Sequence, residues 1–261
     1  MDEIKIMSII DFNTIVSRHN FQRAFLVKDY YITLILYLIK DVNGIYFKGG
    51  TALNKIFLNH ARLSEDIDFT LTKEEKEVRK EIRDILIKLH FVKEILGGKN
   101  MEGFLRMIIK CNSELGESDV FIDLNKRAKL ILPSETHRIN HFYSPFIPEF
   151  SFRIIAKEEL VAEKIRATVT RNKPRDHFDV YKIIKADIPI NLELVKKKCK
   201  EADTEFSVIK MFKKAQMLKN RWDKDMIPLL SEPISFQEVI KFLASHFKLK
   251  EKKKELKTNF S

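Results

Sequence analysis

Asp66 and Asp68, separated by one residue, are the side chains of this sequence best suited to bind a metal ion. They lie in a stretch, 66–71, whose alternation predicts a β-strand, so both carboxylates should point from the same face. Two negative charges about 7 Å apart along a strand repel each other unless a cation lies between them. Mg²⁺ is the natural candidate, because it combines one or two carboxylates with substrate phosphates. An isolated pair of this kind is usually solvated, so the neighbouring residues must show whether this pair binds a metal ion.

A glycine pair shortly before these aspartates indicates a phosphate site. The apolar segment 45–48 predicts a short strand, which runs into Gly49, Gly50 and Thr51 before helical spacing continues over 51–59. Two glycines allow a phosphate to approach the backbone, and Thr51 could cap the helix while offering a hydroxyl. A helix N-terminus also presents unpaired N–H groups and a positive dipole end. A phosphate and a metal ion are therefore expected side by side.

A third carboxylate, Asp123, interrupts the apolar strand 120–124, where a buried aspartate is costly without a partner. If this strand pairs beside Asp66 and Asp68, the carboxylates would complete a site for two metal ions. Asp119, in the turn before the strand, is the less favoured alternative. A Walker A phosphate loop does not fit, because no lysine precedes the threonine of the glycine segment.

The elements that would position these residues divide into two groups. Strands and helices alternate in the first group and only helices follow, so we expect an α+β protein with a mixed sheet, flanking helices and a C-terminal helical bundle. The expected domains are 1–150 and 151–261, with an irregular stretch, 133–148, before the boundary. The expected strands are 45–48, 66–71, 104–110, 120–124 and 152–155. The expected helices are 8–19, 21–40, 51–59, 73–93, 157–170, 175–186, 191–201, 205–219 and 235–247.

The composition limits the class of protein and of partner. A net charge of +11 over 261 residues suits a polyanionic partner such as RNA or a nucleotide, although a lysine-rich proteome would give the same excess. Cys111 and Cys199 show no metal-binding spacing and are expected as free thiols in a reducing compartment. The sequence has neither a signal-peptide pattern nor an apolar stretch long enough for a membrane span. These features predict a soluble, cytoplasmic protein without membrane contact.

Two blocks of the sequence resemble a known family. Lys48–Leu53 (KGGTAL) and Arg62–Phe69 (RLSEDIDF) are similar to the signature of AbiEii/AbiGii-type toxins, which belong to the DNA polymerase β-like nucleotidyltransferases. Glu163–Ala167 followed by Arg175–Asp179 is similar to the downstream motifs of that family. The recognisable blocks span 48–181, which is half of the chain. The resemblance implies a polymerase β-like nucleotidyltransferase core.

The resemblance also implies roles for individual residues. The metal ions, Mg²⁺ with Mn²⁺ as the alternative, would be bound by Asp66, Asp68 and Asp123. Asp123 could instead act as the base for the acceptor hydroxyl. The nucleotide would be bound by Gly49, Gly50, Thr51, Arg62, Ser64 and Lys164. The catalytic set would be Asp66, Asp68, Asp123, Lys164 and Asp176.

The helical pattern makes predictions for Lys164 and Asp176 that do not depend on the family resemblance. Lys164 falls inside the apolar stripe of the helix 157–170, whereas Glu159 falls towards its charged flank. A lysine that points inward needs an anion or a route to water for its ammonium group. Asp176 opens the next helix and would serve as its N-cap. Asp179 would then lie on the opposite side of that helix, where it could hold an arginine.

Together these features predict transfer of a nucleoside monophosphate from a nucleoside triphosphate (NTP) to an acceptor, with release of pyrophosphate. The resemblance implies a toxin with a cognate antitoxin, and an RNA acceptor, in some members the tRNA 3′ end. The lysines at 196–198 and 213–214 would suit an RNA backbone, and Trp222 could stack on a base although a core position is favoured. The alternatives are a protein or small-molecule acceptor, or a nucleotide-binding or partner-binding module of the same fold without catalysis.

Overall fold

The computed structural model describes residues 4–127, 129–171 and 173–258 of the chain. They form two compact units, Met1–Lys157 and Glu158–Ser261. The first unit contains α1 (Ile9–His19), α2 (Arg23–Ile39), β1 (Ile45–Lys48), α3 (Gly49–Ile56), β2 (Asp66–Leu71), α4 (Glu75–Leu86), β3 (Val92–Met101), β4 (Phe104–Ser113), β5 (Gly116–Asn125), β6 (Glu135–Arg138) and β7 (Ser151–Ile154).

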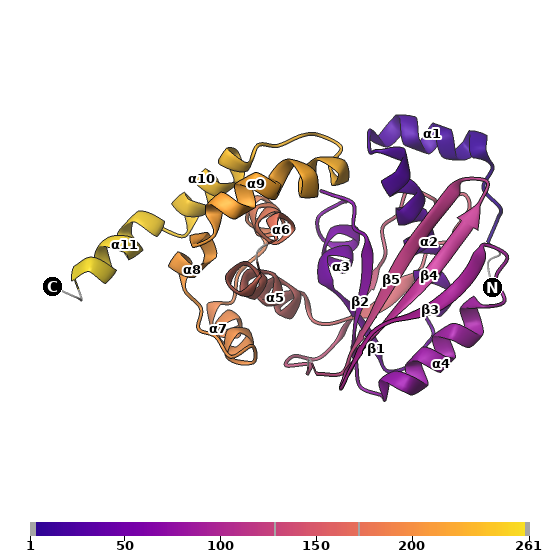
Figure 1. Ribbon diagram of the computed structural model, residues 1–261, viewed down its shortest axis with the longest axis horizontal. Helices are drawn as coiled ribbons and strands as arrows, with labels where there is room; N and C mark the ends of the chain where they lie inside the picture. Colours follow the sequence, from indigo (N-terminus) through magenta and orange to yellow (C-terminus); the bar gives the residue numbers. More distant parts are fainter. Residues whose placement is uncertain (1–3, 128, 172, 259–261) are drawn as a thin grey trace. The chain divides into compact units, whose positions relative to one another are not determined.

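The strands of the first unit form one seven-stranded sheet in the order β3-β4-β5-β2-β1-β7-β6. β2 runs antiparallel to β1 and parallel to β5, and β7 runs parallel to β1. β3, β4 and β5 form an antiparallel meander at one edge, while β6 pairs with β7 at the other. α3 packs on β1 and β2, whereas α2 packs on β5 and α4 on β4 and β5 (Figure 1). The predicted α+β class with a mixed sheet is confirmed.

Alternation of buried and more exposed residues places the core of the first unit on this sheet. Along β4 every second residue is buried, from Leu105 to Cys111. β1, β2 and β7 contribute the rings of Phe47, Phe69 and Phe152, whose centroids lie 5.7–5.8 Å from one another. α2 is buried along most of its length, in agreement with its nearly continuous apolar sequence. This core fixes the backbone of the strands that carry the predicted site residues.

Two strands lie where the sequence predicted other structure. α4 ends at Leu86 and β3 begins at Val92, so the single helix predicted over 73–93 is wrong. β3 is an edge strand with most of its side chains exposed, and its sequence therefore shows little alternation. β6 is also an edge strand, and it lies in the segment predicted as irregular, 133–148. Pairing with a neighbouring strand, which local sequence does not reveal, defines both elements.

The second unit contains only helices among its described residues, as the sequence predicted. They are α5 (Lys157–Thr170), α6 (Pro174–Lys185), α7 (Leu192–Lys200), α8 (Val208–Phe212), α9 (Ala215–Met226), the 3₁₀ helix η1 (Ile227–Leu229), α10 (Phe236–His246) and α11 (Leu249–Thr258). The single helix predicted over 205–219 is wrong, because the chain leaves the helical conformation at Lys214. Trp222 is buried and donates its indole N–H to the backbone oxygen of Ile234, so it belongs to the core. Over the described residues, no helix combines the length and apolar character needed to cross a membrane.

Candidate active site

Asp66, Asp68 and Asp123 lie on two neighbouring parallel strands of the first unit. β2 carries Asp66 and Asp68, and its register with β5 pairs Asp68 with Asp123 and Asp66 with Phe121. Paired residues on adjacent strands point to the same face of a sheet, so Asp68 and Asp123 are neighbours on that face. Asp123 is buried, whereas Asp66 and Asp68 are partly exposed. The structure thus brings these carboxylates to one face of the sheet.

Arg106, on β4, is paired in register with Asp123 and binds both of its carboxylate oxygens. Its Nε and Nη2 atoms donate to Oδ1 and Oδ2 at 2.7 Å each, the bidentate geometry of a strong charge-assisted pair. The hydrogen bond to Asp123 raises the pKa of Arg106, burial opposes the shift, and the charges of Asp123, Asp66 and Asp68 add to it. Arg106 was not predicted from sequence, although an arginine in the strand before that of Asp123 was the available signal.

Asp66 and Asp68 have the donor chemistry and arrangement that fit a divalent cation. They share one strand face, and carboxylate oxygens are the hard ligands that Mg²⁺ prefers. Within the described residues, no three His, Cys, Asp or Glu side chains form a ready metal-binding group. Asp123 already accepts two hydrogen bonds from Arg106, one on each oxygen, so a cation bound there would share its carboxylate with that guanidinium.

Gly49 provides the space in which the Asp68 carboxylate lies. Its φ of +78° is in the left-handed region, which an L side chain rarely adopts. A Cβ atom at this position would lie 2.9 Å from Cγ of Asp68 and closer still to Oδ2. Backbone conformation and packing therefore both require glycine at the point where β1 turns into α3.

Replacing Gly49 with alanine is expected to lower the free energy of unfolding by about 1–3 kcal/mol through the strained backbone conformation. The added Cβ would also displace the Asp68 carboxylate, so affinity for Mn²⁺ should fall. Urea unfolding and electron paramagnetic resonance of Mn²⁺ would measure the two effects. Gly97→Ala is the matched control, because a Cβ at Gly97 meets only the Arg79 guanidinium, at 3.6 Å. Wild-type stability and Mn²⁺ affinity in Gly49→Ala would contradict this reading of the turn.

Thr51 and Asn54 tie the first half of α3 to the segment that leads into β2. The Thr51 hydroxyl donates to the backbone oxygen of Asp66, at the start of β2. Asn54 donates from Nδ2 to the Gly50 oxygen at 3.0 Å and accepts at Oδ1 from the N–H of Arg62 at 3.2 Å. Thr51 is not the helix cap that the sequence suggested, because it lies inside the first turn of α3.

Arg62 and Ser64 continue this connection between α3 and β2. Both are buried, and Arg62 donates from Nη1 to the Ser64 hydroxyl and to the Leu63 backbone oxygen, at 2.9 Å each. The arginine and serine of the second sequence motif therefore organise the loop just before the aspartates. The nucleotide contacts predicted for them remain a proposal.

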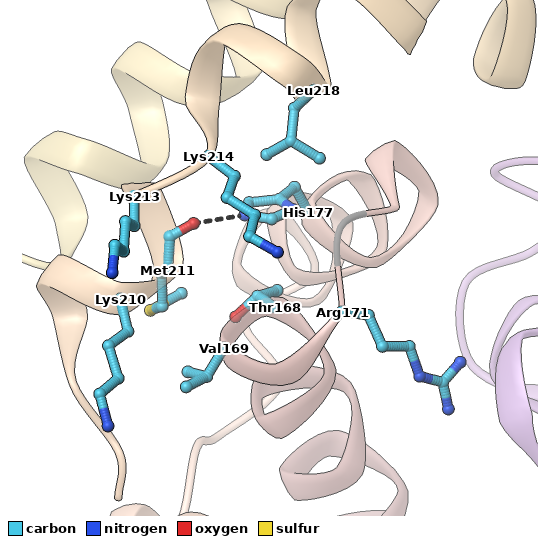
Figure 2. Close-up of a pocket in the computed structure, with 9 residues that line it drawn as sticks. All are labelled: Thr168, Val169, Arg171, His177, Lys210, Met211, Lys213, Lys214 and Leu218. Atoms are coloured by element: carbon cyan, nitrogen blue, oxygen red, sulfur yellow. Dashed lines mark hydrogen bonds between the residues drawn. The ribbon is translucent and has the colours of Figure 1, made fainter. Parts of the chain in front are cut away.

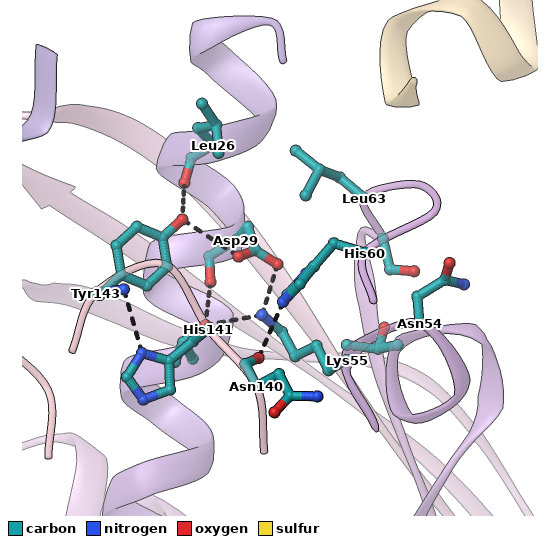
Figure 3. Close-up of polar contacts among 12 residues, drawn as sticks. Leu26, Asp29, Asn54, Lys55, His60, Leu63, Asn140, His141 and Tyr143 are labelled. Atoms are coloured by element: carbon teal, nitrogen blue, oxygen red, sulfur yellow. Dashed lines mark hydrogen bonds and ion pairs between the residues drawn. The ribbon is translucent and has the colours of Figure 1, made fainter. Parts of the chain in front are cut away.

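A buried ion pair anchors α3 to α2. Lys55, on α3, places Nζ 2.7 Å from Oδ1 of Asp29 and donates to the Thr33 hydroxyl at 2.9 Å (Figure 3). Burial, together with the charge of Lys55, lowers the pKa of His60 to about 3 and that of His141 to about 4. Both imidazoles are therefore neutral near neutral pH. These residues were not predicted from sequence, because their pairing depends on how α3 packs on α2.

In the second unit, Lys164 pairs with two aspartates of α6. Its Nζ lies 3.2 Å from Oδ1 of Asp176 and 2.8 Å from Oδ2 of Asp179. Oδ2 of Asp176 is buried and has no hydrogen-bond partner within the described chain. Two predictions are wrong: the N-cap of α6 is Lys173 rather than Asp176, and Asp179 lies on the same side of α6 as Asp176. Residues three apart on a helix share a face.

Lys198 forms a second buried cluster in this unit. Its Nζ lies 2.6 Å from Oε1 of Glu159 and 3.3 Å from Oε1 of Glu163. Glu159 is only 1% exposed, so its predicted place on the charged flank of the helix is wrong. Lys198 is engaged by carboxylates of its own unit, which removes it from the lysines expected to bind RNA.

The fold of this chain is similar to that of solved nucleotidyltransferases. MenT4, a nucleotidyltransferase toxin from Mycobacterium tuberculosis H37Rv, is 23% identical with a TM-score of 0.58, over 71% of this chain and 68% of MenT4. JHP933 from Helicobacter pylori is 19% identical with a TM-score of 0.61, over 92% of this chain and 100% of JHP933. At these identities the likeness shows the fold alone, and it confirms the predicted polymerase β-like core.

The family follows from the sequence. The family model for the nucleotidyl transferase AbiEii toxin of type IV toxin–antitoxin systems matches residues 38–242. The chain therefore belongs to the AbiEii family of nucleotidyltransferase toxins, as its motifs predicted. No curated protein matches the sequence. Membership implies an NTP substrate and an antitoxin partner, and nucleotidyltransferases of this kind typically use a divalent metal ion.

Proposed function

We propose that this toxin transfers a nucleoside monophosphate from an NTP to an RNA acceptor, such as the 3′ end of tRNA, in an Mg²⁺-dependent reaction in the cytoplasm. The observation that carries the proposal is the arrangement of Asp66 and Asp68 on β2, with Asp123 in register and Gly49 against the Asp68 carboxylate. The net charge of +11 supports a polyanionic acceptor.

The reaction would be an in-line displacement at phosphorus. The acceptor hydroxyl oxygen forms a bond to the α-phosphorus while the bond to the bridging oxygen of the β-phosphate breaks, and pyrophosphate leaves with that electron pair. Catalysis of this kind depends on positioning and on stabilising charge. N–H groups at the start of α3, around Gly50 and Thr51, would bind the phosphates, as helix N-termini do.

Each carboxylate has a proposed role in this scheme. Asp66 and Asp68 would hold Mg²⁺, which supplies positive charge for the attacking and leaving oxygens. Asp123 would either bind metal or accept the proton of the acceptor hydroxyl. Either role would act beside the guanidinium of Arg106, which contacts both oxygens of Asp123 at 2.7 Å.

Lys164 and Asp176, in the second unit, are the remaining residues for which the family resemblance implies a role. Lys164 would contact nucleotide phosphates, which would have to compete with Asp176 and Asp179 for its ammonium group. The unpartnered Oδ2 of Asp176 supports a ligand-facing role, because a buried carboxylate oxygen without a hydrogen bond is costly.

The test incubates the purified protein with Mg²⁺, total RNA and each α-labelled NTP in turn, with the Asp68→Ala variant and an EDTA-treated sample alongside. Label from one NTP should enter a tRNA-sized band and disappear in both controls. Pyrophosphate release without label in RNA would indicate that the acceptor is a protein or a small molecule rather than RNA. Absence of pyrophosphate release with every acceptor would favour a nucleotide-binding or partner-binding role without catalysis.

A further inference from the structure

A small basic pocket lies entirely within the second unit, between α5, α6, α8 and the start of α9 (Figure 2). Its volume is about 200 Å³, and its walls carry the cationic side chains of Arg171, Lys210, Lys213 and Lys214. No carboxylate is among the described residues that line it. All four of these side chains are solvent-exposed, so their positive charge surrounds the mouth of the pocket.

These cations differ from the buried lysines of the same unit. Lys164 and Lys198 are each held by carboxylates at 2.6–3.3 Å. In the part of the chain that the structure describes, no carboxylate forms an ion pair with any of the pocket's four cations. Like charges around one cavity repel each other, and a bound anion would relieve that repulsion.

The backbone at the pocket also favours an anion. Lys213 and Lys214 occupy the break between α8 and α9, and α9 then begins at Ala215 without a side-chain cap. The first N–H groups of a helix lack intrahelical partners, and its dipole is positive at that end. His177 donates from Nε2 to the Met211 oxygen at 2.8 Å, and burial lowers its pKa, so it fastens α8 to α6 without adding charge.

The size and walls of the pocket suit a small anionic group such as a phosphate. Pockets for drug-sized ligands begin at roughly 300 Å³, so this one is too small for a whole nucleotide. Apart from the imidazole of His177, no described lining residue offers a ring on which a base could stack. Contacts to phosphate alone position a nucleic acid without reading its sequence.

We infer that this pocket binds a backbone phosphate of the RNA acceptor. The inference rests on the proposed function, since it locates part of the acceptor-binding surface on the second unit. Lys213 and Lys214 supply the charge at its rim, and Arg171, directly after α5, and Lys210, in the middle of α8, add further charge.

The test measures tRNA binding by the full chain through fluorescence anisotropy over a range of KCl concentrations. The variant is Lys213→Glu/Lys214→Glu, and the matched control is Lys219→Glu/Lys224→Glu, which changes the same charge at exposed positions of α9. Each lost phosphate contact should reduce the slope of log K against log salt by about 1, or about tenfold in affinity at 0.1 M salt. The control should lose much less, and thermal melting checks that both variants fold.

Three outcomes separate the inference from the proposed function. Selective weakening of the pocket variant, with a shallower salt slope, supports the pocket. Equal binding by the pocket variant and the control overturns the pocket and leaves RNA as the acceptor. Absence of tRNA binding and of label transfer in the unaltered protein overturns the RNA acceptor itself, and the pocket with it.

Discussion

Replacing Asp66 or Asp68 with asparagine is expected to lower kcat/KM for nucleotide transfer by on the order of 10²–10³-fold. Asparagine keeps the shape of the side chain but removes the charge that binds a divalent cation. The loss should therefore appear in catalysis and in Mn²⁺ affinity, with little change in stability, because both side chains are partly exposed. Label transfer at varied NTP concentration and Mn²⁺ titration by electron paramagnetic resonance would measure the two effects.

Asp119→Asn provides the matched control for these variants. Asp119 lies on β5, the strand that carries Asp123, but it is exposed and pairs in register with Lys110. It should keep wild-type transfer and Mn²⁺ affinity. If Asp66→Asn retained transfer within about twofold of wild type, a difference of only about 0.4 kcal/mol in the barrier, the metal-binding role of β2 would be untenable.

The carboxylate face was open to prediction because strand periodicity is local. Asp66 and Asp68 share a face whenever 66–71 is a strand. The cost of an aspartate in an apolar strand pointed to Asp123, and its register with Asp68 is consistent with that reasoning. Arg106 offered only the weak signal of an arginine in the preceding strand, because its contact with Asp123 depends on the register of the β4–β5 hairpin, which turn geometry sets.

The helical unit shows the same division between local and tertiary information. The apolar stripe of α5 correctly predicted that Lys164 points inward. It could not predict which helix packs against that side chain. Asp176 and Asp179 carried a local signal, because their spacing of three puts them on one helix face. The break at Lys214 and the edge strand β3 had no such signal, since neighbouring elements decide where each ends.

The largest effect on stability is expected from Lys55→Met, which should lower the free energy of unfolding by about 3–5 kcal/mol. The side chains of Lys55 and Asp29 are each 2% exposed, and their charged atoms lie 2.7 Å apart. Tyr143 also directs its hydroxyl at Oδ2 of Asp29, 3.2 Å away, and at the Leu26 backbone oxygen, 3.0 Å away (Figure 3). Removing Lys55 would leave a buried carboxylate without its cation. Urea unfolding followed by circular dichroism would measure the loss.

The double variant Asp29→Leu/Lys55→Met tests whether charge or packing is responsible. Removing both charges avoids the uncompensated carboxylate, so the double variant should recover much of the loss seen in Lys55→Met. If Lys55→Met lowered the free energy of unfolding by less than about 1 kcal/mol, the effect would match that of an exposed ion pair. It would then contradict the burial of the Lys55–Asp29 pair. Because α3 also carries Gly49 and Gly50, a loosened α3 should weaken NTP binding before the whole unit unfolds. The KM for NTP in Lys55→Met, compared with that of the double variant, would show whether the ion pair positions the glycine turn.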